Sequence, residues 1–450
     1  MPNIVDYVKT EMRPFPPSSD EESEGTRRLS DIDSLVLSQL AYVHMPESIP
    51  RLPAQGALRD ADYVPFRELL CAEHFDEMFP TKGAYSSLCA LILAMAASPR
   101  FRDIRLGNYV SVEDDKPGHE KQFAAVCAIL PDGAEFVGYR GSEDSLAAWK
   151  ENFNMAFACP VPAQTSAAEY LRRVAAATDR DFVVGGHSKG GNLAVYASMK
   201  APDDVDRRIL GIYSHDGPGF EQKVLDSLDF ERIRSRVHKT VPEASMIGMI
   251  FESQEDFTVV ESSGHGITEH FAMMWSVRDG DFVRVPSLPQ GTRYFNHTLN
   301  SWVASFTPKQ RERVLTSLFD VLEATGYSTF SDMAVHWREA LPAIREAMRT
   351  VDPADRKLIV TTFKVLFSTA LRTARADRLE QPQRDDGHRR RVALDRDDAR
   401  GHEAEKRRID ADMHALKDEY KHVRHDARAE ARRAKEQYKQ AKRDIKNGLY

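Results

Sequence analysis

The chain has few cysteines and no long apolar run. Four cysteines occur among its 450 residues, and no two of them have the spacing of a metal-binding pair. Reduced, buried thiols are therefore expected, with no metal and no organic cofactor. No apolar run reaches the roughly 18 residues that a membrane-spanning helix needs. The N-terminus also lacks the basic start and apolar core of a signal peptide. The sequence therefore predicts a soluble, cytoplasmic protein without a transmembrane segment.

Excess positive charge is confined to the end of the chain. Residues 376–450 carry 21 Lys and Arg against 17 Asp and Glu, although the net charge of the whole chain is -7. The rest of the chain is therefore acidic, which gives no reason to expect nucleic-acid binding. The end segment is poor in large aliphatic residues and carries Glu–Arg and Glu–Lys pairs at helical spacing. We interpret it as a charged, partly helical tail and a candidate site for a protein partner.

Changes in composition divide the remaining chain into three parts. Residues 1–29 are polar and contain several prolines, which predicts a flexible N-terminal arm. Residues 30–305 are predicted to form the main domain. Residues 306–375 show apolar residues at helical spacing and are predicted to be a helical region.

Within the main domain, short apolar segments alternate with helical patterns. Residues 55–98 have a largely helical pattern, and further helices are expected at 143–157 and 164–178. Strands are expected at 109–112, 123–130, 135–139, 182–184, 209–214, 245–251 and 257–261. This alternation favours the α/β class, with a mostly parallel sheet flanked by helices. In such sheets ligands bind at the carboxyl ends of the strands.

The most informative motif is Gly186-His187-Ser188-Lys189-Gly190, between an apolar strand and a helical pattern. This context is typical of a nucleophile elbow, in which a serine occupies a sharp strand-to-helix turn. Glycine is needed on either side because a side chain there would collide with the neighbouring strand or helix. An ordinary glycine-rich turn is the alternative. A phosphate-binding loop fits less well, because Gly191 and Asn192 stand where Lys and Ser or Thr are required.

A serine nucleophile needs a histidine base and an acid that orients the histidine, and in elbow hydrolases both follow the serine. His270 is our first candidate for the base, because it follows the last expected strand and precedes an apolar stretch that can anchor it. His265 is the alternative. Asp216 is the first candidate for the acid, since it follows the strand 209–214 and begins a tight Asp-Gly-Pro-Gly turn. The later acids stay open as alternatives: Glu243, Glu252 and Asp256.

An oxyanion would need two hydrogen-bond donors near the serine. The backbone N–H of Lys189, directly after the serine, is one candidate. Ser142 is the other, because it lies in the loop after the strand 135–139 and offers both an N–H and a hydroxyl. Ser142 is equally suited to cap a helix that begins near Glu143. The Lys189 side chain is expected to point to solvent.

Several of these motifs also resemble a known family. The segment Gly186 to Ala194, with the sequence GHSKGGNLA, resembles the elbow of a bacterial lipase-like family of unknown function that is related to class 3 lipases. The oxyanion segment Arg140-Gly141-Ser142 is similar to that of class 3 lipases, and Asp216 to Phe220 is similar to a motif of the lipase-like family. The resemblance covers about residues 30–280. It implies an α/β-hydrolase-like fold and a serine esterase or lipase mechanism, with Ser188 as nucleophile and His270 as base.

The sequence thus favours a serine hydrolase that cleaves carboxylic esters of acyl or lipid groups through an acyl-enzyme on Ser188. The alternative is a non-catalytic hydrolase-like module that binds a partner through its helical C-terminal region. The chain departs from the resembled family at Glu269-His270-Phe271, where Gln-His-Asp is expected. The histidine is kept at this point, but both of its neighbours differ.

Overall fold

The structure of the chain is a computed structural model. The chain divides into two units, residues 1–377 and 378–450. The second unit lies outside the described residues, and so do nearly all of the expected helix 143–157 and the charged tail. The structure describes residues 1–17, 26–79, 84–114, 121–142, 155, 159–245, 247–250, 256–264, 266–289, 292–293, 296, 300, 307–327, 336–352 and 356.

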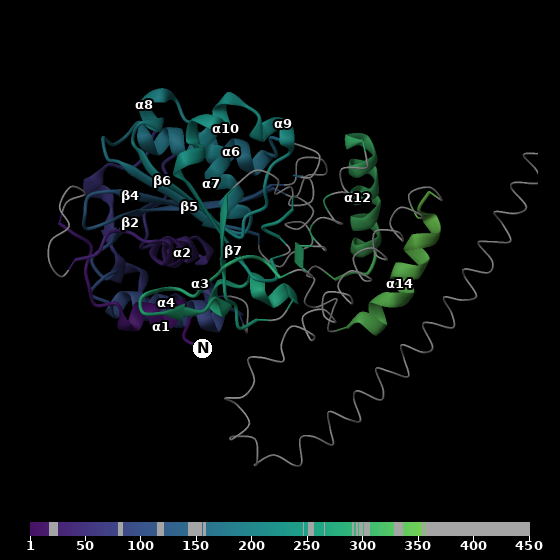
Figure 1. Ribbon diagram of the computed structural model, residues 1–450, viewed down its shortest axis with the longest axis horizontal. Helices are drawn as coiled ribbons and strands as arrows, with labels where there is room; N and C mark the ends of the chain where they lie inside the picture. Colours follow the sequence, from purple (N-terminus) through teal and green to yellow (C-terminus); the bar gives the residue numbers. More distant parts are fainter. Residues whose placement is uncertain are drawn as a thin grey trace, which may run out of the picture. The chain divides into compact units, whose positions relative to one another are not determined.

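A nine-stranded mixed sheet forms the centre of the described residues, with the strands in the order β1-β2-β3-β4-β5-β6-β7-β8-β11 (Figure 1). Neighbours from β4 to β8 run parallel, whereas the strands on either side of this block run antiparallel. The strands are β1 (Val64–Pro65), β2 (Arg105–Asp114), β3 (Lys121–Ile129), β4 (Glu135–Tyr139), β5 (Phe182–His187), β6 (Ile209–His215), β7 (Val237–Pro242), β8 (Phe257–Val260) and β11 (Arg284–Val285). A separate pair consists of β9 (Val277–Arg278) and β10 (Asp281–Phe282).

Helices cover both faces of this sheet (Figure 1). One face carries α6 (Pro162–Ala175), α7 (Lys189–Met199) and α10 (Leu228–Ile233), and the other carries α1 (Ile4–Thr10), α2 (Asp31–Gln39) and α4 (Ala84–Ala97). Shorter elements connect them: α3 (Phe75–Met78), α8 (Asp203–Asp206), α9 (Gln222–Leu225), η1 (Leu40–Tyr42), η2 (Asp60–Asp62), η3 (Phe66–Leu69), η4 (Ala72–His74), η5 (Arg234–Arg236), η6 (Gly266–His270) and η7 (Ala272–Met274). The predicted α/β class is confirmed, and the architecture is α/β-hydrolase-like.

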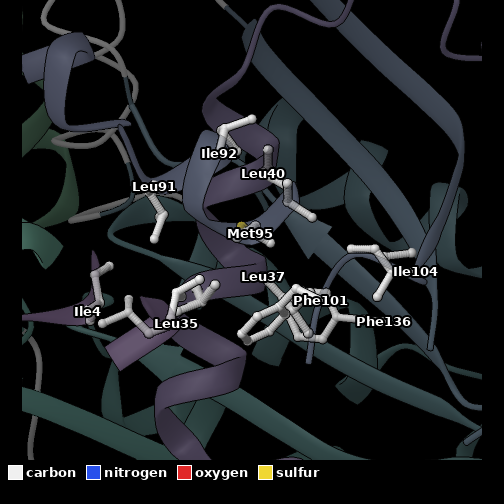
Figure 2. Packing of buried hydrophobic residues seen from close by; sticks show 14 of the residues in the cluster. Ile4, Leu35, Leu37, Leu40, Leu91, Ile92, Met95, Phe101, Ile104 and Phe136 are labelled. Atoms are coloured by element: carbon white, nitrogen blue, oxygen red, sulfur yellow. The ribbon is translucent and has the colours of Figure 1, made fainter. Parts of the chain in front are cut away.

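The two helical layers bury opposite faces of the same strands. Side chains alternate along a strand, so Ala125 and Cys127 of β3 join the core beneath α6 and α7, while Val126 and Ala128 join the core beneath α1, α2 and α4. Figure 2 shows part of the second core, where Phe136 of β4 lies among side chains of the helical layer. The sheet is thus covered by helices on both faces, so a ligand can approach it at the ends of its strands.

The N-terminal segment differs from the expected flexible arm. Helix α1 is capped by Asn3 and packs its apolar residues into the core. Arg100 pairs with Asp33 at 2.6 Å, with both side chains fully buried, and Tyr7 Oη donates to the same carboxylate at 2.8 Å. Arg100 also donates to the backbone carbonyls of residues 13, 27 and 28. The expectation of a flexible arm is therefore wrong for Ile4–Thr10, because the apolar side chains of this helix join the core and Tyr7 donates to the buried Asp33.

Three further differences concern the main domain. The strand expected at 245–251 is wrong for its described residues, which form turns, because the N–H of Gly248 donates to a side-chain oxygen of Asp216 rather than to a neighbouring strand. Strand β7 is not among the expected strands, since half of its residues are polar and it has no apolar run. The stretch 55–98 is helical mainly in its second half, at α3 and α4.

The C-terminal part of the described chain contains two helices within the region expected to be helical. They are α12 (Pro308–Glu323) and α14 (Trp337–Thr350), and they contact each other. Across the ranges that the structure describes, no helix is both long and apolar enough to cross a membrane.

Candidate active site

Ser188 lies between β5 and α7 in a backbone conformation that L-residues rarely adopt, with φ of 59° and ψ of -134°. A Cβ atom at Gly186 would overlap the carbonyl of Gly190, and one at Gly190 would overlap the carbonyl oxygen of Tyr139 on β4. Both glycines therefore permit a close approach of helix and strand that any larger residue would prevent. The N–H of Ser188 donates to the carbonyl of His215 at 2.9 Å. The predicted strand, sharp turn and helix are present, and they hold Ser188 at the carboxyl end of β5 with 7% of its surface exposed.

Asp216 directly follows β6, the next parallel strand, and is fully buried. Its φ is also positive, at 49°, and its N–H donates to the carbonyl of Thr240 on β7 at 2.7 Å. One carboxylate oxygen accepts hydrogen bonds from Ser245 Oγ at 2.5 Å and from the N–H of Gly248 at 3.1 Å. The other oxygen lies 2.6 Å from His270 Nδ1. The carboxylate is thus fixed by three donors, two of them three residues apart in the sequence and the third on the distant His270.

His270 is the last residue of η6, and its side chain is 14% exposed. Because a carboxylate only accepts, Nδ1 carries the proton in the contact with Asp216, and Nε2 of the neutral ring is left as an acceptor. Between the described atoms of Ser188 and the His270 ring there is no hydrogen bond. Hydrogen bonds of this kind are often long until a substrate binds. The structure therefore brings the acid and the histidine together and holds the serine on the neighbouring strand.

The other acids and the other histidine are placed differently. Asp256 is exposed and Glu243 is half-buried, whereas Asp216 is the acid that contacts His270. Glu252 and His265 lie outside the described residues. Of the candidate acids that the structure describes, Asp216 is the one whose carboxylate contacts the His270 ring.

The loop after β4 lies directly against the serine. A Cβ atom at Gly141 would lie 2.9 Å from Ser188 Cβ and 2.6 Å from the carbonyl oxygen of His187. The half-buried Ser142 follows this glycine. Lys189 begins α7, where backbone N–H groups have no acceptor within the helix. Both predicted oxyanion donors therefore belong to segments next to Ser188.

The Lys189 side chain does not point to solvent, so that expectation is wrong. The residue is 1% exposed, and its Nζ donates to the backbone carbonyl of Gln122 on β3 at 2.7 Å. The first turn of α7 faces the sheet, which buries the alkyl chain and leaves the ammonium group a carbonyl acceptor. A carbonyl on β3, two strands away from β5, cannot be anticipated from the local sequence.

Two residues near the site were not singled out by the sequence. His187 is 5% exposed; its Nε2 lies 2.8 Å from the carbonyl oxygen of His270, and its Nδ1 lies 3.2 Å from Tyr42 Oη. Burial is the larger cause and the nearby His270 the smaller one that lower the pKa of His187 to about 3. The position of His187 inside the serine motif is a signal that sequence reasoning had available. Tyr42 gives no such signal, because it is close to His187 only in the fold.

The comparison with family models covers this whole site. The model of the Mbeg1-like family matches residues 95–320, which is half of the chain and includes Ser142, Ser188, Asp216 and His270. The chain belongs to the Mbeg1-like family. A comparison of this Mbeg1-like chain with curated proteins found no match. Among solved structures it is similar to one described as the crystal structure of M37 lipase, with 12% identity over 49% of this chain and 70% of that chain and a TM-score of 0.30. A likeness this weak supports no inference.

Proposed function

We propose that the chain is a serine hydrolase that cleaves carboxylic esters through an acyl-enzyme on Ser188. The observation that carries this proposal is the 2.6 Å contact between Asp216 and His270 Nδ1, at the same edge of the sheet as the strained serine turn. An acid held by three donors, a histidine oriented by it, and a serine on the adjacent strand are the parts that nucleophilic acyl transfer requires.

The proposed reaction has two steps. Ser188 Oγ attacks the ester carbonyl carbon while His270 Nε2 takes its proton, and Asp216 stabilises the imidazolium that forms. The oxyanion of the tetrahedral intermediate accepts hydrogen bonds from the N–H groups of Lys189 and Ser142. His270 then gives its proton to the leaving alcohol, and the acyl group stays on Ser188. In the second step His270 deprotonates a water molecule, which attacks the acyl-enzyme and releases the acid.

Exposed apolar residues beside His270 favour an apolar acyl group in the substrate. Phe271 is 48% exposed and Met274 is 37% exposed, although both are large hydrophobic residues. Trp275 has a different role, because it is fully buried and its indole N–H donates to the carbonyl of Glu269 at 2.9 Å. Phe271 and Met274 are therefore the residues we assign to the acyl chain, and Trp275 anchors the segment.

The test is hydrolysis of p-nitrophenyl esters of graded acyl length by the full chain and by its Ser188→Ala variant. We expect a burst of p-nitrophenol followed by a slower steady rate, because an acyl-enzyme accumulates. Ser188→Ala should lose the burst and at least about 10³-fold in steady rate. Equal rates for the two proteins, with both folded by circular dichroism, would contradict the proposal.

The second candidate function is a non-catalytic hydrolase-like module that binds a partner through the helical C-terminal region. The observation in its favour is that, in the described part of the structure, no hydrogen bond joins Ser188 and the His270 ring. A folded wild-type chain that hydrolyses none of the esters would favour this candidate. Turnover that depends on Ser188 would exclude it.

A further inference from the structure

His187 takes no part in the chemistry proposed above, yet it contacts the segment that carries the proposed base. Its Nε2 lies 2.8 Å from the main-chain oxygen of His270, and the two ring centroids are 4.7 Å apart at an interplanar angle of 32°. His270 is thus held at two points. Asp216 holds its ring, and His187 holds its backbone.

The partners of His187 define its protonation. A carbonyl oxygen only accepts, so Nε2 of His187 carries a proton and donates it to His270. Burial lowers the pKa of His187 to about 3, so the ring is neutral near pH 7 and its Nδ1 is an acceptor. The hydroxyl of Tyr42 lies 3.2 Å from Nδ1 and also 3.2 Å from the carbonyl oxygen of His187, so its one proton is shared between these two acceptors. The His270 carbonyl therefore selects the tautomer in which Nε2 carries the proton, and Tyr42 orients the ring by contacting both Nδ1 and the backbone of His187.

A neutral ring at this position suits the proposed chemistry. His270 becomes an imidazolium when it takes the serine proton, and a second positive charge against its ring would oppose that step. The charged groups near His187 are Asp216 and, during the reaction, His270 itself. His187 can therefore support His270 through hydrogen bonding and ring contact without competing for the proton.

Tyr42 contacts both His187 and the proposed oxyanion loop after β4. Its hydroxyl occupies the space that a Cβ atom at Gly141 would fill, and it lies 3.2 Å from the carbonyl oxygen of His187. Tyr42 belongs to η1, Gly141 to the loop after β4, and His187 to the end of β5. One tyrosine and one histidine thus connect three segments to the backbone of His270.

We propose that His187 is a positioning residue, whose neutral imidazole, oriented by Tyr42, holds the backbone of His270 at the distance from Ser188 that proton transfer requires. This inference rests on the proposed function of Ser188, Asp216 and His270. It predicts that the hydrogen bond from His187 Nε2, rather than the imidazole ring as such, sustains the rate of the chemical step.

The test compares two amides that differ in reach. The amide nitrogen of His187→Gln can take the place of Nε2 and donate to the His270 carbonyl. The amide nitrogen of His187→Asn takes the place of Nδ1 and falls short of it. We expect His187→Asn to lower kcat about 10²-fold with KM little changed, as a small misplacement of a catalytic group does. His187→Gln should restore most of the wild-type kcat. Rates are divided by the number of sites that a fluorophosphonate titrates, so misfolded protein does not count.

Tyr42→Phe is the second variant, and it leaves the histidine in place. Loss of the hydroxyl, which contacts both Nδ1 and the carbonyl oxygen of His187, should lower kcat less than His187→Asn does, again with KM little changed. The inference is overturned if His187→Asn and His187→Gln have the same kcat per titrated site, or if Tyr42→Phe matches wild type. A wild-type chain that neither titrates nor turns over esters contradicts the proposed function itself, and the inference falls with it.

Discussion

The turn that carries Ser188 and the segment that carries His270 are built from different kinds of contact. In the turn, Gly186 and Gly190 let the start of α7 approach β4 and β5 more closely than any side chain would permit. The histidine segment, residues 266–275, is held by partners distant in the sequence, among them Asp216 and His187. The first region is determined by local sterics and the second by hydrogen bonds across the fold. A single substitution at one of the turn glycines should therefore cause a large loss of stability. In the histidine segment, the loss of one hydrogen bond should cause only a partial loss, because the other contacts remain.

The largest expected effect is on the histidine segment. Replacing His270 with alanine removes the proposed base and should lower p-nitrophenyl ester turnover by about 10⁴-fold, the scale of losing a member of a catalytic triad. Steady-state kinetics with a matched melting curve measure it. His265→Ala, which changes the alternative candidate for the base, is the control and should retain activity. An unchanged rate in His270→Ala would assign the base to another histidine.

The next effect concerns the turn. Gly190→Ala places a Cβ atom against the carbonyl oxygen of Tyr139 on β4, where backbone must move, and should destabilise the fold by at least about 3 kcal/mol. Gly138→Ala is the matched control on β4 itself, because its nearest contact is the ring of Phe136 at 3.2 Å. A ring can shift, so about 1 kcal/mol is expected there. Denaturant unfolding of both variants gives the difference, and equal losses would contradict the steric account of the turn.

A smaller and graded effect is expected from pH. Burial lowers the pKa of both His187 and His215 from the ordinary 6.5 to about 3. Between these values the unfolded chain binds protons that the folded chain does not, so the free energy of unfolding falls as the pH falls from about 6.5 toward 3. Denaturant midpoints across this range measure the slope. His187→Gln should reduce that slope, and an unaltered slope would mean that His187 already takes up its proton in the folded state.

The smallest effect tests one anchor of the histidine segment. A carboxylate oxygen of Glu269 accepts the N–H of Ala244 at 2.7 Å. Glu269→Ala removes this acceptor and should cost about 1.5 kcal/mol, whereas Glu269→Gln keeps an oxygen in place and should cost less. Amide exchange at Ala244, together with the unfolding midpoint, measures both variants. No difference between them would show that this anchor does not hold the segment.

The same contrast explains which features could be predicted from the sequence. The strand before Ser188, the glycine turn and the helix after it are encoded within a few neighbouring residues, and the structure has each of them. Asp216 could be singled out because it follows a short apolar strand. His270 could be placed in a loop of suitable position, but its contact with Asp216 depends on how the end of β6 and the segment after β8 come together.

Other features were beyond local reasoning for the same reason. The buried ammonium of Lys189 depends on a carbonyl of β3, and the docking of Ile4–Thr10 includes a hydrogen bond from Tyr7 to the distant, buried Asp33. The turn at residues 247–250 exists because Asp216 accepts an N–H that a strand would otherwise use. In each case a polar group forms a hydrogen bond with a distant segment. The pattern of apolar residues predicts helices and strands, but it does not predict such a partner.

The most direct test of the central claim is covalent labelling of the full chain with a fluorophosphonate, followed by peptide mapping of the adduct. The account predicts one adduct, on Ser188, that Ser188→Ala abolishes and His270→Ala slows strongly. A folded wild-type chain that stays unlabelled, or that carries its adduct on another residue, would contradict the claim that Ser188 is an activated nucleophile.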